Sequence, residues 1–445
     1  MVGLFKALQV ILALSLLIII HEAGHFMWAR IFGIRVEKFY LFFDVGGARL
    51  FSTRMRWFVK LFPKAASWET EYGIGWLPLG GYCKIAGMID ESMDKEFLSH
   101  DPQPWEFRSK PAWQRLLVMN GGVLNNFILA ILVFSLILAI WGKDYIPSDR
   151  PVYPSALAQE MGFRPGDRIL SFDGHQSADF FSLQADLARR QTRKATILRG
   201  ADTLDLYVDQ NYIGKVLNDP GMFGLAIPFV VDSVMDGTPN AATLRHGDMV
   251  VSANGLRTPY VQDLQKILRQ NPGGSVDASV VRGADTLDIA LQVDSLGMVG
   301  VFLSGVDYEH QTFSGLACIP GGAVMAWDNV TGYLRDLRLV ATPSTGAYKS
   351  VGSFIAIGQI FPSRWDWNQF LVILAMLSIM LGVLNLLPIP ALDGGHMVFC
   401  LFEMISGRKP SDKFLTVMQM IGFVLLLALM LLAFGNDFAR LFGLL

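Results

Sequence analysis

The sequence predicts a polytopic α-helical membrane protein: four transmembrane helices and a large polar insertion that is rich in β-strand signals. Of 445 residues, 52% are hydrophobic and only 17% are charged, whereas an average soluble domain carries roughly 25% charged residues. The apolar residues gather in four segments long enough to cross a bilayer, which takes ~20 residues. These segments are, within a few residues, Leu4–Trp28, Val118–Trp141, Phe370–Leu387 and Phe414–Phe434.

The first apolar segment has one feature of a signal peptide, because Lys6 precedes its apolar run. No small-residue cleavage site follows, and the run continues directly into His21 and Glu22. We therefore expect this segment to remain as a true membrane span.

Charged residues set the expected topology. The stretch 33–112 holds eleven Lys and Arg residues, and the loop 397–413 holds three. Because positively charged loops stay in the cytoplasm, both are predicted to be cytoplasmic, while the long polar stretch 143–367 is predicted to be translocated. The balance of 37 basic and 39 acidic residues excludes a basic, nucleic-acid-binding protein.

The translocated stretch contains an internal repeat. The segments 164–174 and 245–255 each read as a Gly-Asp turn, an alternating strand and an Asp-Gly or Asn-Gly turn, which is the pattern of a β-hairpin. Each is followed by a helix-like segment and then by the same heptapeptide, RGADTLD, at 199–205 and 282–288. A period of about 80 residues indicates one small domain per repeat rather than a solenoid.

Both repeats resemble PDZ domains of the bacterial, protease-associated type in these turns and strands. The resemblance implies two α+β PDZ-like domains, at 143–220 and 221–297. PDZ domains add an extended peptide to a sheet edge, so peptide ligands are one expectation. The other is a pair of β-rich spacers with no ligand.

The first span ends in an HExxH motif, formed by His21, Glu22 and His25. Residues i and i+4 share one face of a helix, so the two imidazoles can hold one Zn²⁺ with Glu22 beside them as a general base. Polar side chains at the end of an apolar run can also mark the membrane boundary, but boundaries favour Trp, Tyr, Lys and Arg. Buried ionisable groups instead point to a cavity, a partner or a metal.

A catalytic zinc site needs a third protein ligand, and the best candidate is Asp393, just after the third span. Spans one and three run in the same direction, so His21, His25 and Asp393 are predicted to meet at one depth. The prolines and glycines around Asp393 favour a broken helix with close backbone approach. His396 is a competing ligand, which we expect to support the site or its loop instead.

These features together resemble the site-2 protease family, and within it the bacterial regulator-of-sigma-E type. The HExxH motif in the first span, the Leu-Asp-Gly motif after the third span and the tandem PDZ-like repeats occur in the family's order. The resemblance implies a zinc endopeptidase of the bacterial cytoplasmic (inner) membrane. It places the zinc site toward the cytoplasm and the PDZ-like domains outside.

The resemblance also implies a membrane-re-entrant β-hairpin at 73–87, for which a surface hairpin is the alternative. The stretch 121–127 matches a further family motif, with Gly122 where the family usually has Pro. The substrate-binding residues implied in this way are Asn385, Asn126, Gly80, Gly81 and Tyr82.

The expected domain plan follows from these assignments. It runs 1–32 (first span with HExxH), 33–112 (cytoplasmic and re-entrant β region), 113–142 (second span), 143–220 and 221–297 (PDZ-like domains), 298–367 (linker with a possible amphipathic helix), 368–396 (third span and Leu-Asp-Gly motif), 397–413 (cytoplasmic loop) and 414–436 (fourth span).

The predicted function is hydrolysis of peptide bonds in transmembrane segments of single-span proteins within the lipid bilayer. The resemblance implies anti-sigma factors or remnant signal peptides as substrates. Two other classes stay open: a membrane scaffold with PDZ-like modules and a structural metal site, and a metal transporter. A structural zinc site has four protein ligands, and a transporter predicts more polar residues along the spans.

Overall fold

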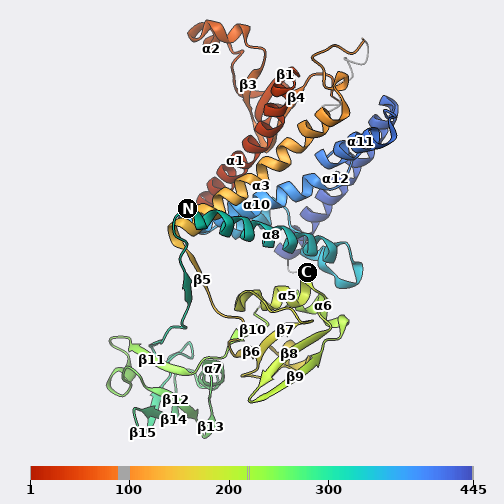
Figure 1. Ribbon diagram of the computed structural model, residues 1–445. Helices are drawn as coiled ribbons and strands as arrows, with labels where there is room; N and C mark the ends of the chain where they lie inside the picture. The colour runs from red at the N-terminus through yellow and green to blue at the C-terminus, as the bar shows by residue number, and fades with distance from the viewer. Residues whose placement is uncertain (1, 89–100, 218, 220, 443–445) are drawn as a thin grey trace. The chain divides into compact units, whose positions relative to one another are not determined.

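The computed structural model describes residues 2–88, 101–217, 219 and 221–442, and these form two compact units (Figure 1). Unit 1 comprises residues 1–142, 312–341 and 348–445, and unit 2 comprises 143–311 and 342–347. The helices of unit 1 are α1 (Val2–Ile31), α2 (Arg56–Leu61), α3 (Ala112–Trp141), α8 (Cys318–Val340), α9 (Phe354–Ile360), α10 (Trp367–Leu386), α11 (Asp393–Ser406) and α12 (Asp412–Leu441).

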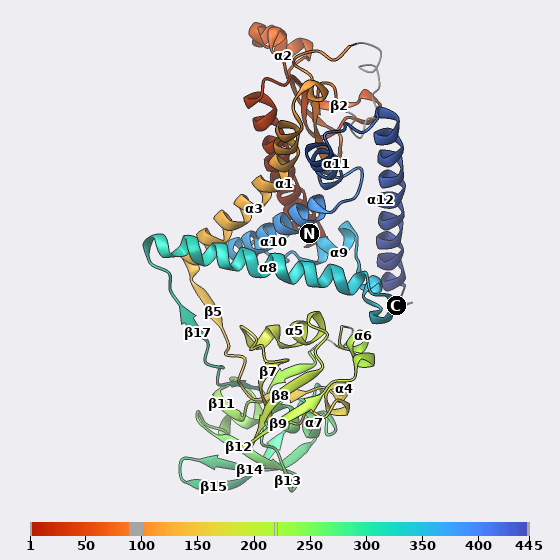
Figure 2. The ribbon, with the colours of Figure 1, turned by 45° about the vertical axis from the view of Figure 1, so that its right-hand side comes forward.

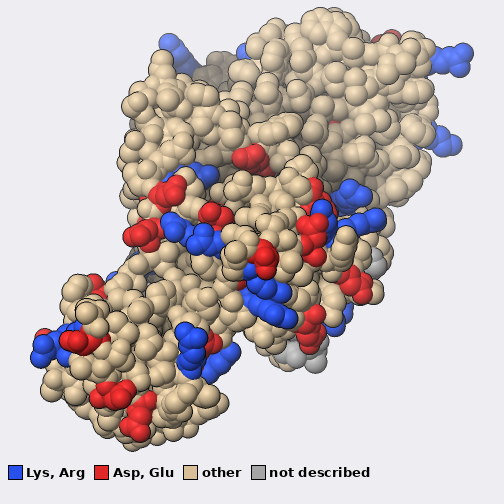
Figure 3. All heavy atoms as spheres, turned by 60° about the horizontal axis from the view of Figure 1, so that its bottom comes forward, with Lys and Arg blue, Asp and Glu red and all other residues tan. Residues whose placement is uncertain are grey.

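Four described helices are long and apolar enough to cross a membrane, which confirms the predicted number of spans. They cover Gly3–Ile31, Ala112–Trp141, Trp367–Leu386 and Lys413–Leu441. Helix α3 packs against both α1 and α10, and α8 lies across α3 and α10 (Figure 2). Charged side chains of both signs cover the repeats of unit 2, whereas the helical part is almost uncharged on the face seen in Figure 3.

Close packing of α1 on α3 depends on glycines. A Cβ on Gly24 would lie 2.2 Å from the carbonyl oxygen of Gly121, and a Cβ on Gly121 would lie 2.5 Å from that of Gly24. Small residues at such crossings let two helix backbones approach closely inside a membrane. This crossing brings α3 directly behind the HExxH motif.

The β region of unit 1 is a four-stranded sheet in the order β2-β3-β1-β4. Its strands are β1 (Val36–Phe43), β2 (Arg49–Ser52), β3 (Glu71–Gly75) and β4 (Leu77–Ile85). The predicted hairpin at 73–87 is therefore wrong, because β1 lies between β3 and β4, parallel to the first and antiparallel to the second. The chain crosses the end of β1 at Gly75, where a Cβ would lie 2.2 Å from the carbonyl oxygen of Phe43.

One further expectation is corrected in unit 1, and a helix is present where the linker was expected to contain one. Residues 397–406, predicted as loop, belong to α11, which begins at Asp393 and ends before Gly407 in a left-handed cap. Helix α8 lies in the predicted linker and packs one face on α3 and α10, with Gly322 and Ala326 buried.

Unit 2 contains the two repeats. The first is built from β6 (Val152–Pro154), α4 (Ala156–Glu160), β7 (Arg168–Phe172), α5 (Leu183–Arg189), β8 (Lys194–Arg199), β9 (Asp202–Tyr207), α6 (Ile213–Val216) and β10 (Phe223–Leu225). The second is built from β11 (Phe229–Val234), β12 (Met249–Ala253), β13 (Leu256–Arg257), α7 (Val261–Arg269), β14 (Ser275–Arg282), β15 (Asp285–Gln292) and β16 (Val301–Leu303). Strands β5 (Lys143–Tyr145) and β17 (Glu309–Gln311) pair at the entry and exit of the unit.

The repeats close in the same way. Strand β10 pairs with β6, and β16 pairs with β11, each antiparallel. These closing strands lie beyond the boundaries at 220 and 297 that the repeat pattern suggested, because the short strands carry no turn motif that marks them.

Candidate metal centre

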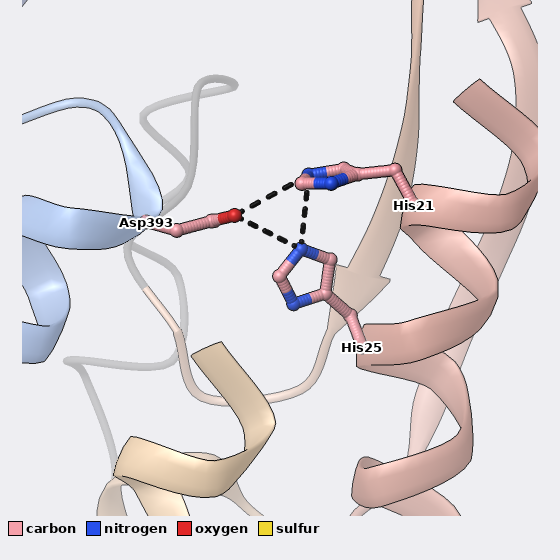
Figure 4. Close-up of side chains that lie close together, drawn as sticks. All are labelled: His21, His25 and Asp393. Atoms are coloured by element: carbon pink, nitrogen blue, oxygen red, sulfur yellow. Dashed lines mark hydrogen bonds and ion pairs between the residues drawn. The ribbon is translucent and has the colours of Figure 1, made fainter. Parts of the chain in front are cut away.

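Three side chains from α1 and α11 converge in unit 1 (Figure 4). His21 and His25 lie one turn apart on α1 and are buried. Their Nε2 atoms are 3.3 Å apart, and each lies 3.3 Å from Oδ2 of Asp393. The structure thus brings together the two imidazoles and the carboxylate that the sequence singled out; His396 does not belong to this group.

The segment between α10 and α11 places Asp393 next to the imidazoles of His21 and His25. Helix α10 ends at Leu386, two residues before Pro388, and Ala391 adopts a φ of 89°, a conformation that is strained for a residue with a side chain. A Cβ on Gly394 would lie 2.2 Å from the carbonyl oxygen of Leu387. The chain therefore turns tightly enough to aim the first side chain of α11 back at α1.

Helix α3 forms the back wall of the site. A Cβ on Gly122 would lie 2.5 Å from Nε2 of His25 and 2.6 Å from Cε1 of His21. Both rings therefore lie against the backbone of α3, and a side chain at position 122 would require them to shift from these positions.

The carbonyl oxygen of Val118 determines how His25 is protonated. It lies 2.8 Å from Nδ1 and can only accept, so Nδ1 carries the proton. In the neutral ring, the Nε2 lone pair then faces His21 and Asp393. Oδ2 of Asp393 is buried and receives no hydrogen bond among the described residues. Nε2 of His25 and Oδ2 of Asp393 are thus acceptors that face Nε2 of His21, and a cation shared by the three atoms would satisfy them.

This donor set fits zinc. Ligand atoms ~2.0–2.1 Å from a tetrahedral zinc ion lie about 3.3 Å apart, which is the separation found here. As ligands, the two histidines would bind through neutral Nε2 atoms and Asp393 through its ionised carboxylate.

Glu22 lies beside this group, on the same helix. Its carboxylate accepts a hydrogen bond from the backbone N–H of Cys83 in β4. Strand β4 itself rests on α1, since a Cβ on Gly81 would lie 2.5 Å from Ile18. The edge of the sheet thus reaches the metal centre, a contact that no sequence periodicity indicated.

The remaining predicted residues fall into two groups. Asn126 and Asn385 lie at the centre: their amide nitrogens are 3.1 Å from Nδ1 and 3.4 Å from Nε2 of His21. Gly80 and Tyr82 lie on β4, and the Tyr82 hydroxyl donates to Oδ1 of Asp44 at 2.8 Å, so this side chain serves the sheet. The sequence did not single out Val118 or Cys83, because both act through backbone atoms.

An HExxH helix among membrane spans, completed by an aspartate from a later helix, defines the site of a membrane-embedded zinc metalloprotease. The profile of Peptidase family M50 matches residues 9–429, and the chain belongs to this family. A protein from Yersinia pestis named Protease RseP is 31% identical over 467 residues, covering 97% of this chain and 98% of its own. Regulator of sigma E protease from Salmonella typhi is 28% identical over 463 residues, covering 97% and 98%.

Proposed function

We propose that this zinc metalloprotease cleaves transmembrane segments of single-span proteins, with the ion held by His21, His25 and Asp393. The observation that carries the proposal is the triangle of buried acceptor atoms, 3.3 Å on each edge. Bound zinc would supply Lewis-acid polarisation of the scissile carbonyl. Only three protein ligands are present among the described residues, which favours a catalytic site over the closed site of a scaffold.

Glu22 acts as the general base and later as the acid. It takes a proton from the attacking water and delivers it to the leaving amine. The N–H of Cys83 holds one side of its carboxylate, so the other side is oriented toward the centre.

Asn126 positions His21, and Asn385 handles the substrate backbone. Oδ1 of Asn126 is buried and has no hydrogen-bond partner among the described residues, while its amide nitrogen faces Nδ1 of His21. The two ends of an amide have the same shape. With the ends exchanged, Oδ1 accepts from Nδ1–H and leaves Nε2 of His21 free for the metal.

The free edge of β4 presents the substrate. Among the described strands, β4 pairs only with β1 in its sheet. The edge around Gly80, Gly81 and Tyr82 leads to Glu22 through the backbone of Cys83. An unwound substrate segment added to this edge regains the backbone hydrogen bonds that it gives up inside the bilayer. Substrates with helix-weakening residues near the cut are therefore cleaved best, and a strong Leu/Ala helix at the cut abolishes cleavage.

The substrates are anti-sigma factors or remnant signal peptides, with the site toward the cytoplasm and the repeats on the outer side of the inner membrane. In support, a relative is named for regulation of sigma E. The repeats are PDZ-like and act as a size filter or peptide binder. Deleting residues 150–296 lets untrimmed substrates be processed.

The two repeats differ as peptide sites. In the first, the outward carbonyl of Leu225 on β10 accepts a hydrogen bond from Gln262 of the second repeat at 2.7 Å. In the second, the outward backbone groups of Val301 and Leu303 on β16 meet no partner within the described chain. The second repeat is thus the one open to strand addition.

The decisive experiment compares the full-length protein with its Glu22→Gln variant, with Glu160→Gln as a matched surface control. Zinc content and cleavage of a model single-span protein are measured together. We expect Glu22→Gln to keep zinc and lose cleavage, and the control to keep both. Cleavage that survives Glu22→Gln overturns the assignment. Metal transport by the wild type, without cleavage, supports the transporter instead.

A further inference from the structure

A short segment between β2 and β3 combines cations with exposed apolar rings. We call residues 54–68, which include α2, the basic–aromatic segment. It carries four Lys and Arg residues, and no acidic residue occurs anywhere in 45–68. The metal centre uses none of it.

Three of the four cations form no ion pair with a carboxylate of the described residues. Arg56, Lys60 and Lys64 are exposed and meet no carboxylate within the described chain. Arg54 instead closes the segment, because its guanidinium donates to the carbonyl oxygens of Ala65, Ala66 and Trp68.

Apolar side chains lie among these cations on the same exposed surface. Trp57 is 57% exposed, Leu61 is 65% exposed and Phe62 is 51% exposed. On α2, positions 56, 57, 60 and 61 share one face, so this face alternates cationic and apolar groups. Such a face suits neither bulk water nor a hydrocarbon core.

The segment is firmly supported from behind. The ring of Phe58 lies 5.3 Å from Phe51, 5.0 Å from Phe62 and 6.4 Å from Trp68. The chain of rings continues from Trp68 to Tyr72 at 6.0 Å.

These ring contacts place the basic–aromatic segment beside the C-terminal end of α1. Tyr72 lies 6.2 Å from Phe26 of α1, and Glu69 pairs with Arg30 of α1. Both α1 residues lie in the last two turns of a span that ends at Ile31. The basic–aromatic segment therefore lies where α1 leaves the bilayer, at the end of α1 opposite the N-terminus in Figure 1.

We propose that the basic–aromatic segment docks into the headgroup layer of the adjoining leaflet and recognises anionic phospholipids. Trp57, Leu61 and Phe62 enter the boundary between headgroups and acyl chains, while Arg56, Lys60 and Lys64 reach outward to phosphates. In the orientation given under the proposed function, on which this inference rests, the adjoining leaflet is the cytoplasmic one; it is negatively charged, so charge complementarity favours this occupant. The interspersed cations and rings match a mixed layer better than an acidic protein surface.

The test uses the full-length protein in nanodiscs of phosphatidylcholine with and without phosphatidylglycerol. A spin label at Leu61→Cys, in a background with Cys83, Cys318 and Cys400 replaced, reports collisions with oxygen and with a water-soluble nickel chelate. Tyr207→Cys, also highly exposed, is the control. We expect the label at 61 to be shielded from nickel in the anionic discs, and the label at 207 to be accessible in both.

Each cation contributes to the docked population. Replacing Arg56, Lys60 or Lys64 by Gln lowers the ratio of docked to undocked label about fivefold per residue in anionic discs, with little change in neutral ones. Equal nickel access at 61 and 207 in both lipids overturns the proposal. So does shielding at 61 that appears only when an acidic cytosolic protein is added.

A second measurement avoids the replaced cysteines. Brominated lipids quench tryptophan fluorescence at a known depth, and the difference between wild type and Trp57→Phe isolates Trp57. We expect quenching of Trp57 by lipids brominated near the headgroup. Its absence, with the other tryptophans quenched normally, also overturns the proposal.

Discussion

The two units differ in whether the carboxylate oxygens that they bury have hydrogen-bond donors. In unit 2, Asp248 accepts from Nε and Nη2 of Arg282, both at 2.7 Å, and from the backbone N–H of Arg245 at 2.8 Å. Asp167 of the first repeat accepts from Arg199 in the same two-pronged way, with both contacts at 2.8 Å. The shared Gly-Asp turn and RGADTLD heptapeptide thus encode one closed ion pair, built twice.

In unit 1, the carboxylate of Asp393 faces two ring nitrogens, and its Oδ2 receives no hydrogen bond from the part of the chain that the structure describes. A buried charge left this way is unfavourable unless something else binds it. The difference separates structural from functional carboxylates. A carboxylate whose oxygens accept hydrogen bonds from an arginine stabilises the fold, whereas a carboxylate that faces the lone pairs of two imidazoles can bind a cation.

The largest expected effect comes from Asp393→Ala. This change removes one of three ligands, so zinc affinity should fall by more than about 100-fold, beyond the effect of losing an outer-shell partner, and cleavage should disappear. Thermal stability of the metal-free protein should hardly change, because no satisfied pair is broken. Equilibrium zinc binding and a melting curve measure the two. A large loss of metal-free stability would erase the distinction between the two kinds of carboxylate.

Gly122→Ala should have the next largest effect. The new Cβ would lie 2.5 Å from Nε2 of His25, so the rings must shift from the positions that face Asp393. We expect zinc affinity to fall about 10- to 100-fold, with a parallel loss of cleavage. Gly435→Ala in α12, where a Cβ meets nothing within 4 Å, is the control and should leave zinc affinity unchanged. Unchanged affinity in Gly122→Ala would show that α3 does not shape the site.

The sequence predicted the parts of the site that depend on side-chain patterns and missed the parts that depend on backbone contacts. The spacing of His21 and His25 on a helix, and the shared direction of spans one and three, are local or topological features, so the sequence alone points to Asp393. The repeats were visible because their turns and heptapeptide recur. Backbone contacts leave no such trace: the Val118 carbonyl and the Cys83 amide have no side-chain signature.

Strand order escaped prediction for a related reason. The hairpin expected over 73–87 was implied by the family resemblance, and the resemblance of one segment does not say which strands pair. The insertion of β1 between β3 and β4 depends on contacts with a strand about 40 residues earlier. One residue is consistent with this strand order: Gly75 lies against the carbonyl of Phe43, where a side chain would clash as the chain passes the end of β1.

Arg282→Met tests the closed pairs. It leaves the buried carboxylate of Asp248 without its guanidinium partner, which destabilises the fold, and the loss should be confined to the second repeat. Hydrogen exchange on the full-length protein measures this as faster exchange in β12 and β14. Arg199→Met should produce the mirror result in β7 and β8. Zinc binding should be unaffected in both variants, and a fall in zinc affinity would mean that the two kinds of carboxylate are not independent.

The smallest expected effect is an acid dependence of the second repeat. Hydrogen bonds from Arg282 lower the pKa of Asp248 below its ordinary value near 4. On acidification the unfolded chain therefore takes up the proton first. The stabilisation is complete above that ordinary value and is lost as pH falls through the lower folded pKa. Protection of β12 and β14 should thus be flat from neutrality to about pH 5 and decline below pH 4. In Arg282→Met this decline should vanish or reverse, because the unpaired carboxylate gains from protonation; an unaltered decline would assign the acid sensitivity to another group.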